Sequence, residues 1–515
     1  MDRGELGRRV TSGSLWTILA YGLNLPLGVV TNLVVANALG PEQFGRYASI
    51  LVITGLLGVA ADLGTGAALL QHGIASESTG SSESTRRLLA AAQTLRFVQA
   101  PLGLIAVVVL VSGAPGWLVI AYGAGTLLGA VVGNAPLLHQ FRNLTARVAR
   151  INLVVSGATS LAAMVAALQS ADGSIVFLVR GVLAVASPVA LFLCLSRSDR
   201  SMLVRPGSLR VLPEGFWRFA LPTWLSSVFG MIVFSRSETA LLRWLGHEAD
   251  AGVFAVAFGL AMQATGPLDA LAPVLLGALT STFSSARNQV QVVVRRTAHF
   301  FSLFLAPVVL LLLCSPAVLP LIYGDGYREV GWLLLPLLVS SALQTLAHPV
   351  QAFAFAARAG QLLLWTNIVA AVVDIAVVLL LAPQFGAWGA VVANVAAQIT
   401  ALLILTRHAV QGIPVQVRAL LITCAPLFLA FLIVAGIGSA LAVLVPVSVP
   451  VYVAAAVLAL VAWLGVVRIG RLGLTSDDAD AMLRHAPAPV AKVGGLLLRV
   501  TGRRPASPTG ADAQA

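Results

Sequence analysis

The stretch LGPEQFGRYA at residues 39–48 decides the fold, because it recurs as LGHEADAGVFA at residues 245–255. Both copies begin with Leu-Gly, carry a Glu two residues on, and continue with Gly, an aromatic residue and Ala. The second copy has one additional residue. Each copy lies between two long apolar runs, so one short membrane-edge loop is written twice in the same chain.

The composition of the chain excludes a soluble globular protein. Of its 515 residues, 58% are hydrophobic and 10% are charged, whereas a soluble domain has about 25% charged residues. The apolar runs have the length of about 20 residues that a helix needs to cross a bilayer. They lack the strict alternation of polar and apolar residues that a membrane β-barrel requires. The sequence therefore predicts an all-α polytopic membrane protein.

Apolar runs bounded by Gly, Pro and charged residues predict fourteen transmembrane helices. They lie near residues 14–38, 47–71, 88–112, 116–138, 151–169, 174–196, 219–243, 252–276, 298–320, 331–354, 363–382, 386–406, 419–444 and 450–468. With a cytoplasmic N-terminus, most of the 32 Lys and Arg residues fall into cytoplasmic connections, as the positive-inside rule demands. The outer connections hold acidic residues: Glu42, Asp172, Glu248, Asp250, Asp325 and Glu329. Both termini are therefore expected in the cytoplasm, and the net charge of +12 indicates membrane orientation and no nucleic-acid binding.

The two copies of the loop follow the predicted first and seventh spans. Because an even number of spans separates them, both face the same side, which indicates a parallel internal repeat about an axis along the membrane normal. After the additional residue the offset is 207, which pairs Gly45 with Gly252 and Asp62 with Asp269. The predicted fold is two six-helix lobes followed by two extra C-terminal helices. The expected divisions are the first lobe with its inner linker (1–213), the second lobe (214–410), the last two spans (411–468) and a disordered cytoplasmic tail (469–515).

Three stretches of the chain resemble one family of membrane transporters. They are LGPEQFGRYASILVITGLLGVAADLGTGAALLQ at 39–71, LIYGDGYREVGWLLLPLL at 321–338 and LAPQFGAWGAVVANVAAQ at 381–398. Each resembles a motif of the polysaccharide transport (Wzx-like) branch of the multidrug/oligosaccharidyl-lipid/polysaccharide (MOP) exporter superfamily. The resemblance covers about residues 10–410. The chain departs from the family at Asn37, where members often have an arginine.

The resemblance implies a V-shaped, two-lobed flippase in the inner (cytoplasmic) membrane that works by alternating access. The implied substrate is an undecaprenyl-diphosphate-linked oligosaccharide, a polysaccharide precursor that is moved outward. The implied partners are this lipid-linked glycan, the membrane lipids, and polysaccharide polymerase or assembly proteins. No cofactor is expected, and the candidate coupling ions are Na+ and H+.

Three arginines lie within the predicted spans: Arg96, Arg180 and Arg236. An ionisable residue near the bilayer centre costs about 2.5–3.5 kcal/mol, so each one requires a reason. Arginine suits a diphosphate because its planar guanidinium binds two oxygens at once and stays charged. We therefore interpret these residues as candidates for binding the substrate headgroup. The alternative is that each side chain extends to the membrane interface along its alkyl stem.

Four acidic residues also lie within the spans: Asp62, Asp269, Glu238 and Asp374. The functional interpretation is protonation or cation binding that is coupled to rocking of the two lobes. The alternative is hydrogen bonding between helices, which would stabilise the bundle. Two further stretches, Asn24-Leu-Pro26 and Thr265-Gly-Pro267, predict broken helices, because proline removes a backbone hydrogen bond.

Two other classes of function match the sequence less well. A drug/cation antiporter of the same superfamily usually has twelve spans and a cavity dominated by acidic groups. A membrane polysaccharide polymerase, ligase or lipid-linked glycosyltransferase would carry its chemistry on a large outer loop, and every predicted outer connection is short. The sequence has no Ser/His/Asp, paired-carboxylate or metal-ligand pattern, and Cys194, Cys314 and Cys424 are isolated in apolar runs. The chain is therefore predicted to be neither an enzyme nor a metalloprotein.

Overall fold

The computed structural model describes residues 3–66, 68–69, 82–110, 114–142, 144–234, 237–269, 290–357, 359–408 and 417–473. Every regular element in these ranges is a helix, so the all-α fold class is confirmed. Twelve helical segments in the same ranges are long and apolar enough to cross a membrane. The count of fourteen spans stays a prediction, and residues 474–515 of the expected tail lie outside the described ranges.

The helices follow one another along the chain with short connections. The first are α1 (Arg3–Asp62), α3 (Ser82–Leu110), α4 (Gly116–Val132), α5 (Ala135–Phe141), α6 (Thr145–Gln169), α7 (Gly173–Ala184), α8 (Ala186–Leu193), α9 (Arg197–Val204) and η1 (Leu209–Val211). The middle ones are α10 (Phe216–Phe234), α11 (Ser237–Trp244), α12 (Glu248–Asp269), α14 (Val290–Leu311), η3 (Leu312–Cys314), α15 (Ser315–Tyr323) and η4 (Asp325–Tyr327). The last are α16 (Val330–Ala356), α17 (Gly360–Phe385), α18 (Ala387–Arg407), α19 (Val417–Thr423), α20 (Ala425–Leu444) and α21 (Val449–Ile469).

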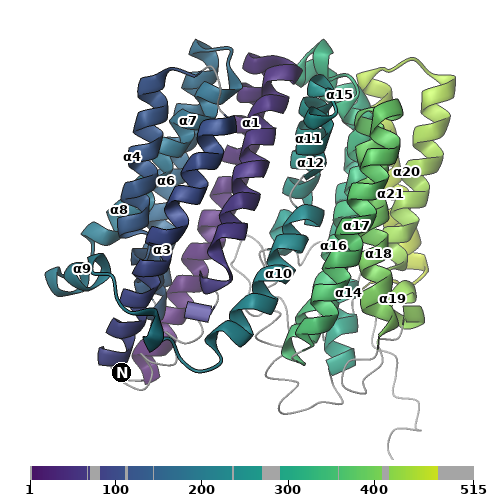
Figure 1. Ribbon diagram of the computed structural model, residues 1–515. Coiled ribbons are helices and arrows are strands. Elements are labelled where there is room, and N and C mark those ends of the chain that lie inside the picture. Colours follow the sequence, from purple (N-terminus) through teal and green to yellow (C-terminus); the bar gives the residue numbers. More distant parts are fainter. Residues whose placement is uncertain are drawn as a thin grey trace, which may run out of the picture.

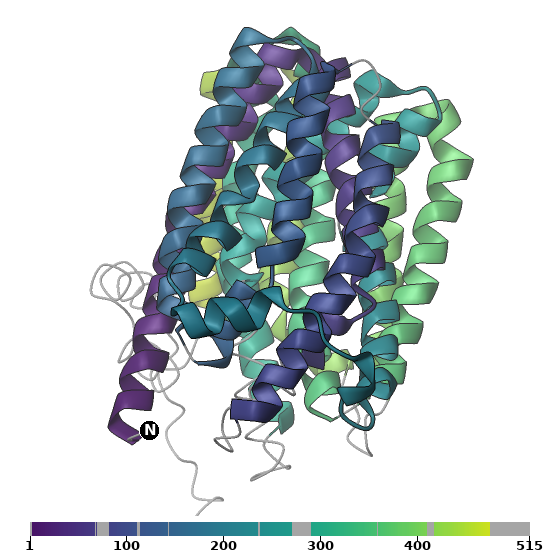
Figure 2. The same ribbon diagram turned by 60° about the vertical axis from the view of Figure 1, so that its left-hand side comes forward.

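These helices pack into two bundles, and α1 contacts both. In the first bundle (α1 and α3 to α8), α6 packs against α1 and α7, and α4 packs against α3 and α7. In the second bundle (α10 to α12 and α14 to α18), α17 packs against α10 and α18, and α16 packs against α12 and α18. The two C-terminal helices, α20 and α21, pack against α14. Figure 1 shows the bundles side by side, and Figure 2 shows that their long helices run in roughly the same direction.

The first helix, α1, reaches from the first predicted span into the second. Its backbone departs from helical geometry at Gly40, with φ 71° and ψ 170°, which glycine adopts without the steric penalty of a side chain. The helix continues through Pro26, and α12 continues through Pro267. The predicted breaks at Asn24–Pro26 and Thr265–Pro267 are therefore wrong. Proline has no N–H, so one backbone carbonyl group in the preceding turn lacks its helical hydrogen bond. A membrane helix remains continuous at a proline where neighbouring groups donate a hydrogen bond to that carbonyl oxygen.

An ion pair fastens the connection after α8 to the first bundle. Arg142, which follows α5, donates from Nη1 and Nη2 to the two carboxylate oxygens of Asp199, both at 2.9 Å. Ser196 Oγ donates to Oδ2 of the same carboxylate at 2.7 Å. The hydrogen bonds from Arg142 hold the pKa of Asp199 below its ordinary value, and partial burial opposes them. The two-pronged contact holds α9 against the end of α5.

Replacing Asp199 with asparagine is expected to lower the stability of the protein at pH 7 by about 1 kcal/mol, a typical value for a partly exposed pair of good geometry. Because the pKa of Asp199 is lowered in the folded state, its contribution is present above the unfolded pKa and is lost as the pH falls through the folded pKa. Thermal unfolding of variant and parent should therefore converge once the pH is below the folded pKa of Asp199. The control is Asp325→Asn, since the side chains of Asp325 and Arg328 are 87% and 74% exposed and such a pair contributes little. Equal unfolding of Asp199→Asn and parent at pH 7 would contradict the prediction.

Candidate functional site

Polar side chains from four helices meet inside the second bundle. We call them the carboxyl cluster: Ser237 and Glu238 of α11, Ser340 of α16, Asp374 of α17 and Asn394 of α18. The side chains of Glu238 and Asp374 have no solvent exposure. Asn394 Nδ2 donates to Glu238 Oε1 at 2.5 Å, and Asn394 Oδ1 accepts a hydrogen bond from Ser340 Oγ. Ser237 Oγ donates to Asp374 Oδ2 at 3.3 Å.

The carboxyl groups of Glu238 and Asp374 lie close enough for a strong electrostatic interaction. Two buried carboxyl groups in contact do not both carry a charge unless a cation lies between them, because like charges repel strongly away from water. The pair can therefore hold one proton, or one cation in its place. Two of the four acidic residues predicted from the sequence thus lie in one cluster, and their role in ion coupling stays a prediction.

Arg96 belongs to a polar network inside the first bundle. Its Nε donates to Asn134 Oδ1 at 2.6 Å, and Asn134 Nδ2 donates to Gln93 Oε1 at 3.0 Å. Asp62 lies close enough to Arg96 for a favourable electrostatic interaction, and its carbonyl oxygen accepts a hydrogen bond from Gln99 Nε2 at 3.2 Å. The structure therefore brings together two candidates that were considered separately. These contacts supply a structural role for Arg96, and its role in headgroup binding stays a prediction.

The remaining sequence candidates are distributed over both bundles. Arg180 of α7 donates from Nη1 to the hydroxyl oxygen of Tyr47 at 2.7 Å, within the first bundle. Arg236 lies outside the described residues, and the side chain of Asp269 is not described either. The roles predicted for these three residues are therefore still predictions.

Sequence reasoning missed the amide and hydroxyl groups that surround the carboxyl groups. Asn394 and Ser340 were not singled out, nor was Asn134 of the arginine network. The signal that would have found Asn394 is an amide side chain in the middle of an apolar run, because a buried amide needs hydrogen-bond partners. Ser340 carries a weaker signal, since a serine in a membrane helix can bond to its own backbone.

The two copies of the repeated loop contact each other directly. A Cβ added to Gly45 would lie 2.8 Å from the backbone nitrogen of Gly252 and would overlap the carbonyl oxygen of Glu248. A Cβ added to Gly252 would overlap the carbonyl oxygen of Pro41. Only residues without a side chain allow two backbones to approach this closely. We call this contact the glycine seam (residues 41–45 and 248–252).

A third motif adds to the closure at the glycine seam. Tyr327 Oη donates to the carbonyl oxygen of Ala36 at 3.0 Å, and Asn37 Nδ2 donates to the carbonyl oxygen of Ile322 at 2.8 Å. Asn37, the point of departure from the family motif, thus bonds the first helix to the second bundle. All these contacts lie at the end of the molecule that the charge distribution assigns to the exterior. The two bundles are closed against each other at that end.

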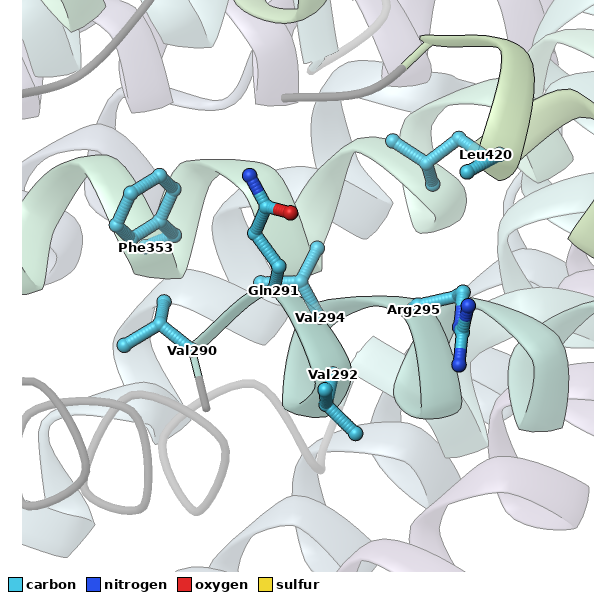
Figure 3. A pocket seen from close by; sticks show the side chains of 8 residues that line it. Val290, Gln291, Val292, Val294, Arg295, Phe353 and Leu420 are labelled. Atoms are coloured by element: carbon cyan, nitrogen blue, oxygen red, sulfur yellow. The ribbon is translucent and has the colours of Figure 1, made fainter. Parts of the chain in front are cut away.

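Two cavities lie outside the polar clusters. The first, of about 100 Å³, is near the start of α14, and Figure 3 shows Gln291 and Arg295 of α14 with Phe353 of α16 and Leu420 of α19 around it. The second is an apolar groove of about 590 Å³ between α16, α18 and α20, where Ser439 supplies the one hydroxyl group. Neither cavity has a residue of the carboxyl cluster in its lining, so neither is assigned as the coupling site.

Solved structures with a similar arrangement of helices include a lipid II flippase and two transporters of the MOP superfamily. "Lipid II flippase MurJ, inward closed conformation" is 13% identical, with a TM-score of 0.63 over 87% of this chain and 98% of that one. An inward-facing multidrug resistance MATE family transporter of the MOP superfamily is 16% identical, with a TM-score of 0.58 over 75% and 96% of the two chains. A MOP superfamily transporter from Pyrococcus furiosus is 15% identical, with a TM-score of 0.52 over 85% and 97%. The chain has the fold of MOP superfamily transporters.

The family follows from the sequence match. Residues 34–331 match the family described as polysaccharide biosynthesis protein. The chain belongs to this family, which agrees with the resemblance found in the motifs. No curated protein sequence matches the chain significantly.

Proposed function

We propose that this protein is a flippase, not an enzyme, that moves a lipid-linked oligosaccharide across the cytoplasmic membrane by alternating access. The substrate is a polysaccharide precursor carried on undecaprenyl diphosphate. The observation that carries the proposal is the match to the polysaccharide biosynthesis family over residues 34–331, which include the glycine seam and Glu238. The likeness in fold to a lipid II flippase supports a lipid-linked substrate. The glycine seam fits one end state of the cycle, in which the exterior is closed.

In the proposed mechanism, different residues bind the anionic headgroup and couple transport to an ion. The headgroup candidates remain Arg96, Arg180 and Arg236, and the coupling candidates remain Asp62, Asp269, Glu238 and Asp374. Among the latter we favour Glu238 and Asp374, because their carboxyl groups are neighbours without solvent exposure. The lobes of the cycle are residues 1–213 and 214–410, with both termini in the cytoplasm.

The test of the proposal is reconstitution into liposomes with undecaprenyl-diphosphate-linked sugars, scored by exposure of the glycan on the far leaflet. Arg236→Ala is expected to abolish this exposure at normal levels of inserted protein, because an arginine within a span is tolerated where it meets an anionic group or water. Arg236→Lys should recover part of the activity, since an ammonium keeps the charge but loses the two-pronged geometry. Full activity of Arg236→Ala would mean that the diphosphate is bound elsewhere.

A second candidate function is a drug/cation antiporter. The fold similarity to a MATE transporter and the buried carboxyl cluster favour it. It predicts uptake of organic cations into the same liposomes, driven by a proton or Na+ gradient, and no movement of lipid-linked sugar. The two assays together therefore separate the candidates.

A further inference from the structure

The second predicted span is interrupted directly after Asp62. Helix α1 ends at Asp62, and the next residues, Leu63 and Gly64, have φ values of 51° and 71°. A left-handed backbone is sterically unfavourable for leucine, so it persists only where the surrounding structure imposes it. The interruption therefore depends on groups that replace the lost helical hydrogen bonds.

Side chains supply the replacement. The last four carbonyl groups of α1 have no donor within the helix. The indole Nε1 of Trp224, on α10, donates to the carbonyl oxygens of Val59 and Ala60 at 3.0 Å each. The carbonyl oxygen of Asp62 accepts a hydrogen bond from Thr65 Oγ1 at 2.7 Å. One indole from another helix thus satisfies two of the four carbonyl groups.

The backbone of α10 also lies directly against the interruption. A Cβ added to Gly64 would overlap the carbonyl oxygen of Ala220 and would lie 3.0 Å from Trp224 Cβ. Further along α10, Asn367 of α17 donates from Nδ2 to the carbonyl oxygen of Ser226 at 3.0 Å. Helix α10 is therefore held by the first bundle near Gly64 and by the second bundle near Asn367. A relative movement of the bundles must strain or break one of these contacts.

We propose that Trp224 is a positioning residue for the conformational cycle. Its indole N–H holds the second span in the interrupted form, and its release allows Leu63 and Gly64 to join a continuous helix. The inference rests on the proposed transport function, because a cycle is what requires two arrangements. A segment with two discrete arrangements, contacted by a helix of the other bundle, passes the movement of one bundle to the other.

The test measures docking of α10 by disulfide cross-linking. Cysteines replace Gly55 and Met231, since a Cβ at Gly55 would lie 2.8 Å from Met231 Cε, and alanine replaces the native Cys194, Cys314 and Cys424. Trp224→Phe keeps an aromatic ring and loses the N–H. It is expected to lower the rate of cross-linking about fivefold, the effect of one average hydrogen bond on an equilibrium. The matched control is Trp217→Phe, an exposed tryptophan on the same helix, which should leave the rate unchanged.

A second variant is expected to shift the equilibrium between docked and released α10 in the opposite direction. Leu63→Gly is expected to raise the rate of cross-linking, because glycine adopts a positive φ without steric penalty. It keeps the test decisive if Trp224→Phe fails to fold. Equal rates in Trp224→Phe, Trp217→Phe and the parent would overturn the proposal, as would a shift of Trp224→Phe and Leu63→Gly in the same direction. If these shifts occur but the parent flips no lipid-linked sugar, the proposed substrate is wrong, whereas the part of Trp224 in docking α10 stands.

Discussion

A protein carrying Glu238→Gln is expected to insert normally and to unfold at a higher temperature than the parent, yet to transport no substrate. Glutamine keeps the size of the side chain and an oxygen that can accept the hydrogen bond from Asn394 Nδ2. It removes one of two neighbouring carboxyl groups that have no solvent exposure. Burial of such groups costs stability, so relief by about 1 kcal/mol should raise the midpoint by about 1 °C. Transport is lost because the pair can no longer exchange its proton or cation.

The two readouts distinguish a coupling role from a structural one. Flipping is measured at matched protein levels, with and without gradients of H+ and Na+, and unfolding is followed in the same preparation. The matched control is Glu329→Gln, the same chemical change at an exposed outer position, which should alter neither readout. A Glu238→Gln protein that unfolds at a lower temperature and still flips substrate would show that the carboxyl cluster is structural.

A methyl group at Gly252 is expected to open the exterior end of the protein. In Gly252→Ala the new Cβ would overlap the Pro41 carbonyl oxygen and lie 2.7 Å from its carbon, which are backbone atoms that cannot rotate away. Overpacking of this kind costs about 1–3 kcal/mol, and this cost falls on the closed arrangement alone. The equilibrium between the closed and open arrangements should therefore shift away from the closed one by about fivefold or more. The transport rate should fall, because the cycle must return through this arrangement.

Opening can be measured by the reactivity of a buried position. Ala36 has no solvent exposure, and its carbonyl oxygen accepts the hydrogen bond from Tyr327. A cysteine at Ala36 should react with an impermeant thiol reagent from outside in the Gly252→Ala protein and remain protected in the parent. The matched control is Gly58→Ala, because a Cβ at Gly58 would meet no atom within 4 Å. Equal protection in all three proteins would contradict the role of the glycine seam.

The sequence predicts some features of this molecule and not others, for physical reasons. The repeated loop can be recognised in the sequence because a close contact between two backbones allows few residue types. The glycines Gly45 and Gly252 are therefore a direct signal of that contact. The carboxyl cluster is not visible as a cluster, since Glu238 and Asp374 are brought together by the packing of α11 against α17. The prolines predicted breaks that the helices do not show. The interruption that does occur, at Leu63, depends on a donor from Trp224 that local propensity cannot encode.

The glycine seam is reciprocal, and this bears on the origin of the chain. Gly45 meets the carbonyl oxygen of Glu248, and Gly252 meets that of Pro41. The offset between the copies is 206 before the additional residue and 207 after it, so Pro41 corresponds to His247, the neighbour of Glu248, and the two contacts are nearly one contact with the copies exchanged. Such exchange is the property of an isologous interface between identical subunits related by a two-fold axis. An ancestor of half the length could therefore have formed the same contact as a homodimer. Fusion of two such genes would have freed each half to specialise, with an arginine network in one and a carboxyl cluster in the other.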